Sequence, residues 1–348
     1  MKLSANLLRW ARLFDAGLRR VRRAILPAEM VVFEDATAPW LTSALGTACR
    51  LELPARVPSA QPRALTELAS ELGVESALLR RLFRMLVAHG YFNLNEDETA
   101  VSHNKLSRSL VKGRAGSFCL LQADSWYRDC FAGDRAARAL ASGVVPFDSI
   151  AGNPFFEFAK VDSKAGGLFS EAMAEISRFC APLLADALPL EAGEKVLDVG
   201  GGNGEFCRTL SAHHPGVRFA AMDMENHSDR DGMTHFQGCF FDEIPQGFDH
   251  LLLKNILHDW DDDRAVTILE NCRRASPKLS VIELVLPERA SPGVSAADFS
   301  VDWNVHCTLG GCERTLSEYQ ALFQRAGWEL AGSVPTATPL WILALTRK

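Results

Sequence analysis

Long hydrophobic runs are missing from this sequence of 348 residues, and its nine cysteines form no C-x-x-C pair. Because a membrane-spanning helix needs roughly 20 consecutive apolar residues, the first absence excludes a membrane span. The scattered and odd-numbered cysteines argue against a disulfide framework and a structural zinc site, so we expect a cytoplasmic protein. The length predicts two packed units, because a single core seldom serves more than about 250–300 residues.

Excess positive charge is absent outside the first 28 residues. That segment holds seven basic side chains against the single acidic Asp15, a net charge of +6, whereas the whole chain carries −6. The rest of the chain therefore carries −12. A body this acidic is a poor electrostatic match to nucleic acid, whose binding depends on phosphate neutralisation. We expect no nucleic-acid partner.

The same basic segment, residues 1–28, carries apolar residues at a spacing of three to four, which predicts an amphipathic helical arm. These residues are Leu3, Leu7, Trp10, Phe14, Leu18, Val21 and Ile25. We favour a helix that packs on its own body or on a partner subunit. Association with an anionic membrane surface and a transit peptide are less favoured alternatives, since both also use basic amphipathic helices.

A compact unit follows the arm. Residues 64–73 and 75–89 predict two short helices, and a polar turn at 95–98 predicts a small β-hairpin after them. This order resembles a winged helix. Three arginines on the second helix lie where a DNA-recognition helix would carry them, so DNA binding is an alternative. We favour a dimerisation module, because the body is acidic and a fold does not fix a function.

Residues 118–185 form a mostly helical pattern with clusters of aromatic residues. We interpret these clusters as ordinary core, and a ligand pocket is the less favoured alternative.

Beyond residue 194 the pattern changes to that of an α/β domain. Short apolar runs rich in β-branched residues then alternate with helical stretches. The runs are 195–199, 218–222, 234–237, 249–254, 279–286, 328–334 and 340–346. They predict a mainly parallel, Rossmann-like sheet of seven strands covered on both faces.

A glycine-rich turn follows the first of these strands. Gly200, Gly202 and Gly204 precede a predicted helix, in the place where doubly wound sheets bind ligands. A dinucleotide fingerprint, G-x-G-x-x-G, would have its third glycine where Glu205 stands, and that carboxylate would face a pyrophosphate. We therefore expect no dinucleotide. The spacing G-x-G-x-G behind Asp198 suits S-adenosylmethionine, which has no phosphates and whose ammonium favours nearby negative charge.

Asp223 supports a nucleoside cofactor. It ends the second predicted strand, nineteen residues after Gly204. A carboxylate at this place can accept hydrogen bonds from both ribose hydroxyls. Together, the turn and Asp223 favour a nucleoside cofactor over a purely structural turn.

Several separated motifs resemble those of the small-molecule O-methyltransferases of plants and bacteria. They are DVGGGNG, LLKNILHDWDDDRAVTILENCRRA, VIELVLPE, GGCERT and VPTATPL. The resemblance implies a class I methyltransferase sheet, a mainly helical N-terminal winged-helix dimerisation domain, a homodimer, and S-adenosylmethionine as cofactor. It runs from about residue 30 to the C-terminus. After the arm (1–28), we expect a dimerisation domain (29–115), a helical linker and substrate lid (116–185) and a catalytic domain (186–348).

The resemblance also implies roles for individual residues. His258 is the general base, and Glu283 and Glu313 orient it and stabilise its charged form. The cofactor-binding residues are Asp198, Gly200, Gly202, Asp223, Cys239, Phe240 and Lys254, and the substrate pocket includes Met173 and His306. A phenol has a pKa near 10, so an imidazole that takes its proton makes the oxygen a better nucleophile. Base catalysis of this kind needs no metal, and we expect none.

Some positions depart from the family pattern. Cys239 stands where the family has an aspartate that accepts the adenine amino group, Cys312 where a basic residue is frequent, and His306 where the residue is aliphatic. The connector from Asp223 to Cys239 is also several residues short. Two alternatives therefore stay open. One is an enzyme that binds the cofactor but catalyses decarboxylation, hydroxylation or rearrangement. The other is a binding or regulatory protein without catalytic activity. We favour methyl transfer to a hydroxyl group, and specifically a phenolic hydroxyl, of a small secondary metabolite.

Overall fold

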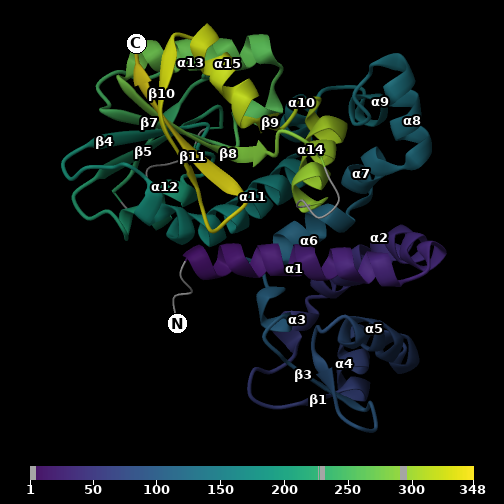
Figure 1. Cartoon of the computed structure of the whole chain (residues 1–348). Helices are drawn as coiled ribbons and strands as arrows, with labels where there is room; N and C mark the ends of the chain where they lie inside the picture. Colours follow the sequence, from purple (N-terminus) through teal and green to yellow (C-terminus); the bar gives the residue numbers. More distant parts are fainter. Residues whose placement is uncertain (1–4, 226, 228–231, 291–295) are drawn as a thin grey trace. The chain divides into compact units, whose positions relative to one another are not determined.

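The structure, a computed structural model, describes residues 5–225, 227, 232–290 and 296–348 (Figure 1). It contains two compact units. The first comprises residues 1–25, 133–155 and 177–348, and the second comprises 26–132 and 156–176. The segment 116–185 is thus shared between the units, and the boundaries expected for the four segments stay a prediction. Among the described residues, no helix combines the length and apolarity that crossing a bilayer requires.

The helices and strands alternate as follows. The helices are α1 (Ala5–Ile25), α2 (Ala28–Arg50), α3 (Leu53–Arg56), α4 (Leu65–Leu72), α5 (Ser76–Ala88), α6 (Gly116–Ala123), α7 (Ser125–Arg128), α8 (Gly133–Ser142), α9 (Asp148–Ala151), α10 (Phe155–Val161), α11 (Ser163–Leu184), α12 (Glu205–Ser211), α13 (Asp262–Ala275), α14 (Ala296–Leu309) and α15 (Leu316–Arg325). The 3-10 turns are η1 (Ser107–Ser109), η2 (Asp129–Phe131), η3 (Ala185–Ala187) and η4 (Leu257–Asp259). The strands are β1 (Arg63–Ala64), β2 (Asn93–Leu94), β3 (Ala100–Ser102), β4 (Lys195–Val199), β5 (Arg218–Asp223), β6 (Thr234–Gln237), β7 (His250–Lys254), β8 (Lys278–Leu286), β9 (Arg314–Thr315), β10 (Trp328–Pro335) and β11 (Leu340–Arg347).

The first unit is built on the predicted α/β sheet. Seven strands lie in the order β10-β11-β8-β7-β4-β5-β6, and the short β9 pairs with β8. Strands β4 to β8 are parallel, whereas β11 runs antiparallel to β8 and β10 runs antiparallel to β11. The prediction of a mostly parallel, Rossmann-like methyltransferase sheet is confirmed. Because the strands are parallel, the loops after β4, β5, β7 and β8 meet at one edge.

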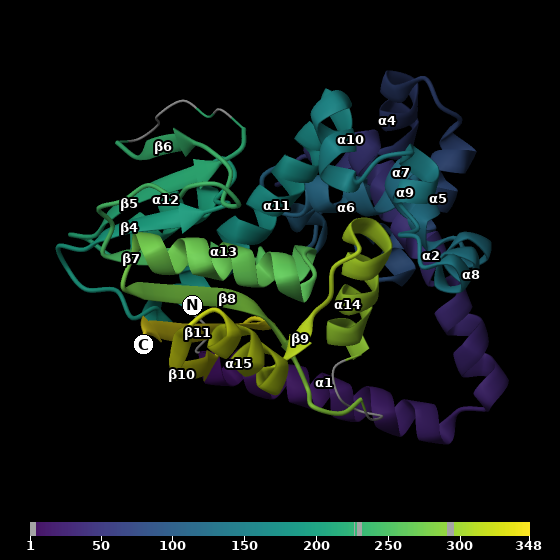
Figure 2. The ribbon, with the colours of Figure 1, turned by 90° about the horizontal axis from the view of Figure 1, so that it is seen from above.

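Helices cover both faces of this sheet. Figure 1 shows α13 and α15 on one face and α12 on the other, and Figure 2 shows α13 running beside β7 and β8. The strand interiors are continuously apolar because both faces are buried. Leu251 and Leu253 on β7 belong to a core that also holds Ile268 on α13 and the fully buried Trp328. The Trp328 indole donates a hydrogen bond to the Leu269 carbonyl at 2.9 Å, which satisfies its single polar atom.

The second unit contains the predicted winged helix. Helices α4 and α5 lie between β1 and the hairpin of β2 and β3, and the three strands form a small antiparallel sheet in the order β1-β3-β2. Phe83 on α5 meets Phe92 edge to face, with ring centroids 5.3 Å apart, and both side chains are buried. Arg84 on the second helix is engaged in an ion pair with Glu98. The helices thus bury their apolar faces and leave arginines outward, as the pattern predicts.

Candidate active site

The glycine turn after β4 requires glycine for two different reasons. Gly200, Gly202 and Gly204 have φ angles of 75°, 55° and 76°, a region that residues with a Cβ rarely adopt. A Cβ on Gly200 would also lie 2.5 Å from the Ile256 Cδ1 atom, beyond the end of β7. A Cβ on Gly202 would meet nothing within 4 Å. The space beside Gly202 is therefore open, in a place where a ligand can approach the backbone.

Two acidic residues support the turn. Asp198 is 2% exposed, and its carboxylate lies so close beneath Gly201 that a Cβ there would be 2.8 Å from Oδ2. Burial raises the pKa of Asp198 to about 7, although the charge of Lys254 opposes the shift. Asp223, at the end of β5, accepts a hydrogen bond from the Gly202 N–H at 2.9 Å. The Asp223 carboxylate therefore contacts the glycine turn. Its predicted contact with the ribose hydroxyls of a cofactor stays a prediction.

An aromatic wall stands next to the turn. The Phe240 ring would lie 3.4 Å from a Cβ on Gly200, and it meets Trp260 with ring centroids 6.1 Å apart. The Asn271 amide donates to the Phe240 carbonyl at 2.7 Å and fixes this loop. Cys239 precedes Phe240 and is half-buried. Sequence reasoning missed Trp260 and Ile256 as members of this wall, although both belong to a quoted motif.

Lys254 ends β7 at the same edge of the sheet. Its ammonium lies 5.5 Å from the centroid of the Phe206 ring, on the first turn of α12. It is also the cation whose charge acts on Asp198. The structure therefore brings Asp198, Asp223, Phe240 and Lys254 together around the glycine turn.

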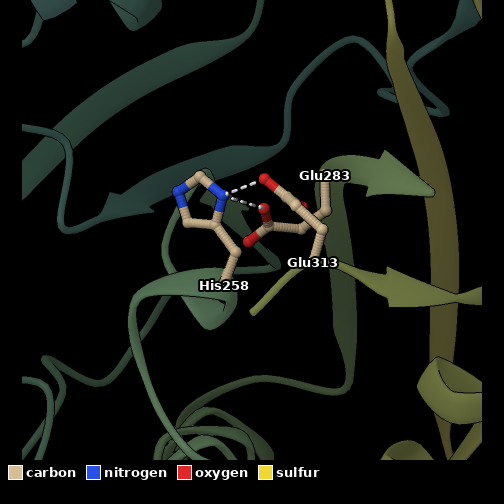
Figure 3. A group of neighbouring side chains, drawn as sticks. All are labelled: His258, Glu283 and Glu313. Atoms are coloured by element: carbon tan, nitrogen blue, oxygen red, sulfur yellow. Dashed lines mark hydrogen bonds and ion pairs between the residues drawn. The ribbon is translucent and has the colours of Figure 1, made fainter. Parts of the chain in front are cut away.

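His258 and two glutamates form a cluster beside this edge (Figure 3). His258 lies on η4, directly after β7, whereas Glu283 comes from β8 and Glu313 precedes β9. The Nδ1 atom of His258 is 2.6 Å from Glu313 Oε1 and 3.7 Å from Glu283 Oε2. The other ring nitrogen, Nε2, points away from both glutamates and lies 3.2 Å from Asp259 Oδ1. Three carboxylates therefore surround one imidazole.

The charges of this cluster govern its protonation. Burial disfavours the charged imidazole, but the charges of Glu313, Glu283 and Asp259 outweigh this effect and raise the pKa of His258 well above its ordinary value. Burial raises the pKa of Glu283 and raises that of Asp259 to about 7. These carboxylates thus favour the protonated imidazole, which can act as a base only in its neutral form.

The η4 turn is held by groups that sequence reasoning did not single out. The N–H groups of Ile256 and Leu257 donate to Glu283 Oε1 at 2.9 and 2.8 Å, so this carboxylate fixes the backbone as well as the imidazole. The buried Arg314 donates to the carbonyls of Leu257 and Trp260 at 3.0 and 2.8 Å. Both ends of the turn that carries His258 are therefore anchored from inside the protein.

Glu313 is positioned by α14. Its N–H donates to Asp302 Oδ1 at 2.9 Å. His306 lies one turn further along α14, with its ring centroid 5.8 Å from that of Trp303. Met173 belongs to the other compact unit, where it packs against a cluster around Leu121, Tyr127 and Ala172. The roles of His306 and Met173 in a substrate pocket stay predictions.

The cluster also has the composition of a cation site. Ligand atoms of His258, Glu283 and Glu313 lie within 4.8 Å of one another. However, the 2.6 Å between His258 Nδ1 and Glu313 Oε1 is the length of a charge-assisted hydrogen bond. Two bonds of about 2.0–2.2 Å to a shared metal would hold these atoms further apart. The distance favours proton chemistry, and the expectation that no metal is needed stays a prediction.

Comparison with known families decides the identity. Residues 133–329, more than half of the chain, match the model of the O-methyltransferase domain, and residues 34–113 match that of the O-methyltransferase dimerisation domain. The chain belongs to the S-adenosylmethionine-dependent O-methyltransferase family. The predicted fold, enzyme class and cofactor are thereby confirmed.

Individual relatives cover nearly all of this O-methyltransferase. It is 29% identical over 340 residues to a phenazine O-methyltransferase of Lysobacter antibioticus, which covers 92% of this chain and 97% of that protein. The structure of the mitomycin 7-O-methyltransferase MmcR is 29% identical, with a TM-score of 0.79, over 94% of this chain and 99% of the other. CalO1, a methyltransferase in calicheamicin biosynthesis with SAH bound, is 27% identical, with a TM-score of 0.79 over 92% and 98% of the two chains.

The residues present in this methyltransferase fit the cofactor. Open space adjoins Gly202, and Phe240 and Trp260, whose rings meet edge to face, offer apolar contact to an adenine ring. Lys254 supplies one cation for a carboxylate, and Asp223 supplies acceptors for hydroxyls. The negative charge of Asp223 suits a ligand that has no phosphates and carries positive charge.

Proposed function

We propose that this enzyme methylates a phenolic hydroxyl of a planar aromatic natural product, with His258 as the general base. The contact of His258 Nδ1 with Glu313, beside the glycine turn, carries the proposal. It engages Nδ1, so Nε2, which lies 3.2 Å from Asp259 Oδ1, is the ring nitrogen that would meet an acceptor. The relatives named for phenazine and for myricetin act on such ring systems and support the acceptor class.

In the proposed mechanism, His258 moves one proton. In the neutral imidazole, Nε2 accepts the proton of the acceptor hydroxyl while the hydroxyl oxygen attacks the methyl group. Glu313 and Glu283 stabilise the imidazolium that results. The cofactor, when bound, supplies an electrophilic methyl group. Lys254 would hold its carboxylate, Asp223 its ribose hydroxyls, and Phe240 with Trp260 its adenine. Positioning by these residues would supply much of the rate, because oriented reactants avoid an entropic cost.

A transfer assay tests the proposal. The purified protein is titrated with S-adenosylmethionine and then incubated with methyl-labelled cofactor and a panel of hydroxyphenazines and flavonols such as myricetin. We expect a labelled ether on at least one phenol. Cofactor binding without label on any acceptor would contradict methyl transfer to phenols and would favour non-methylating chemistry. Label on an amine or thiol of an analogue, but not on its hydroxyl, would contradict the acceptor class.

The raised pKa of His258 predicts the pH dependence of activity. Below this pKa the base is protonated, so kcat/KM should rise as pH increases through it. Glu313→Gln removes one of the charges that raise the pKa, and we expect the rising limb to move to lower pH. The plateau should fall by roughly tenfold or more, because a neutral amide oxygen stabilises the imidazolium less than the carboxylate does. Profiles of kcat/KM measure both effects. Glu329→Gln, on the exposed surface of β10, is the control. If the rising limb of the kcat/KM profile stayed at the same pH in Glu313→Gln, His258 would not be the base whose pKa Glu313 raises.

Cys239 offers a gain-of-affinity prediction. A thiol is a weak acceptor, whereas a carboxylate at this position could accept a hydrogen bond from the adenine amino group. We expect Cys239→Asp to lower the Kd for S-adenosylmethionine by about tenfold, because hydrogen bonds to charged groups contribute roughly 1.5–3 kcal/mol. Calorimetric titration measures the change. Cys239→Ser, similar in size and uncharged, should change the Kd little. An equal or weaker affinity in Cys239→Asp would mean that adenine lies elsewhere.

We also propose that the enzyme is a homodimer whose N-terminal region forms the interface. On α1, Trp10 and Phe14 are 70% and 68% exposed, and on α2, Phe33 and Trp40 are 67% and 66% exposed. Large exposed apolar stripes of this kind mark interaction surfaces. The match to the dimerisation family model begins within α2 and supports the assignment. Light scattering should give twice the 38.2 kDa of one chain. A monomer at micromolar concentration would contradict it. A cytoplasmic location stays a prediction.

A further inference from the structure

A cavity of about 420 Å³ opens in the first compact unit, away from the cofactor edge. It adjoins α12 at the amino ends of β4, β5 and β6. Its lining includes Lys195, the first residue of β4, and Val217 and Arg218 at the start of β5. The glycine turn lies at the opposite, carboxyl ends of these strands. The two places are connected by side chains, because Arg208 in the lining donates to the Asn203 carbonyl at 3.2 Å, and a Cβ on Gly204 would overlap the Cε atom of Met233.

The cavity accompanies an unusual connection. Parallel strands need a crossover of about a dozen residues or more, commonly a helix that packs on the sheet. The crossover from β4 to β5 carries α12, but only residues 224–233 join β5 to β6, and the described part of this segment contains no helix. The side of α12 that faces β6 is thus not covered by a neighbouring described helix. The short connector noted in the sequence therefore coincides with a groove.

The floor of the groove is apolar and aromatic. Phe219 on β5, Phe236 on β6 and Phe248 before β7 all line it, together with Val217 and Met233. Phe236 and Phe248 meet edge to face with centroids 5.9 Å apart. Such rings offer apolar contacts to a small aromatic ring, and the volume lies within the usual range of about 300–1,000 Å³ for ligand pockets.

The rim of the groove is positive, in a protein that is negative overall. Lys195, Arg208 and Arg218 line it, and no carboxylate belongs to its described lining. Lys195 and Arg218 are exposed. Arg208 is paired with Glu205, which also binds Arg178. In a chain of net charge −6, the exposed Lys195 and Arg218 beside an aromatic floor favour an anionic ligand.

We propose that this groove binds a small aromatic acid, a carboxylate or sulfonate whose ring lies on the phenylalanines and whose anion meets Arg218 and Lys195. The site is separate from the acceptor site and goes beyond the proposed methyl transfer. Because exposed charges are screened, the affinity should fall as salt is added.

Calorimetry with 2-naphthoate tests the proposal, with S-adenosylhomocysteine present at saturation. We expect binding that weakens by roughly fivefold in Arg218→Glu, the size expected for losing an exposed charge pair. Ser211→Trp, which places a large side chain on the exposed end of α12, should abolish it. Arg81→Glu, an exposed arginine of the other unit, is the matched control and should change nothing. The melting temperature and the cofactor affinity of each variant show whether it has folded.

Two results would overturn the proposal. Equal binding of 2-naphthylmethylammonium would show that the positive rim does not select the ligand. Naphthoate binding that survives both Arg218→Glu and Ser211→Trp would place the ligand elsewhere, for example in the acceptor pocket. Neither result would bear on methyl transfer, which is measured separately with the labelled cofactor.

Discussion

Replacing His258 by alanine is expected to lower kcat by about a thousandfold, within the range of roughly 10²–10⁴ attributed to general bases. The affinity for S-adenosylmethionine should stay within about twofold, because the imidazole contacts Glu313, Glu283 and Asp259 and not the glycine turn. A thousandfold corresponds to about 4 kcal/mol in the activation free energy. Single-turnover transfer to the preferred phenol measures the chemical step directly.

The remaining rate of this variant carries information as well. Removing the imidazole leaves Glu283 and Glu313 buried and without their cation, so one of them should take up a proton, and the fold should be retained. His89→Ala, at an exposed helix end of the other unit, is the control for loss of a histidine. If the turnover of His258→Ala stayed within about tenfold of the unchanged protein, positioning alone would account for catalysis, and the base assignment would be wrong.

The strands could be predicted closely from the sequence. The apolar run at 195–199 coincides with β4, and the run at 249–254 contains β7. Parallel strands are buried on both faces, so they appear as continuous apolar runs whose length matches the strand. The glycine turn was predictable for a related reason, because its positive φ angles leave few alternatives to glycine.

The support of the catalytic turn could not be predicted in this way. Arg314 belongs to a quoted motif, but its function depends on the Leu257 and Trp260 carbonyls, which only the folded chain brings within reach. The proximity of Asp259 to Nε2 depends on the 3-10 geometry of η4. Periodicity describes faces of regular elements, whereas these contacts join a short turn to distant segments. The division of residues 116–185 between two units likewise depends on packing that local patterns do not contain.

The contact between Gly311 and the catalytic turn gives the second large expected effect. A Cβ at Gly311 would lie 1.9 Å from the His258 carbonyl oxygen and 2.7 Å from the Asp259 carbonyl carbon. Both are backbone atoms, so the strain cannot be relieved by a change of side-chain rotamer. The next residue, Cys312, donates its N–H to the same His258 carbonyl at 2.9 Å. Gly311→Ala should therefore push η4 away from the segment that carries Glu313 and lengthen the hydrogen bond between His258 and Glu313.

We expect Gly311→Ala to lower kcat by about a hundredfold, because a displacement of about 1 Å can cost that much. Overpacking should also lower the free energy of unfolding by about 1–3 kcal/mol. The cofactor affinity should change little, since the glycine turn after β4 is not contacted. Gly332→Ala on β10, where a Cβ meets nothing within 4 Å, is the matched control. Steady-state kinetics with thermal unfolding separate the two effects. A Gly311→Ala enzyme with unchanged kcat would show that η4 moves without loss, and that the position of His258 is less critical than its contact with Glu313 implies.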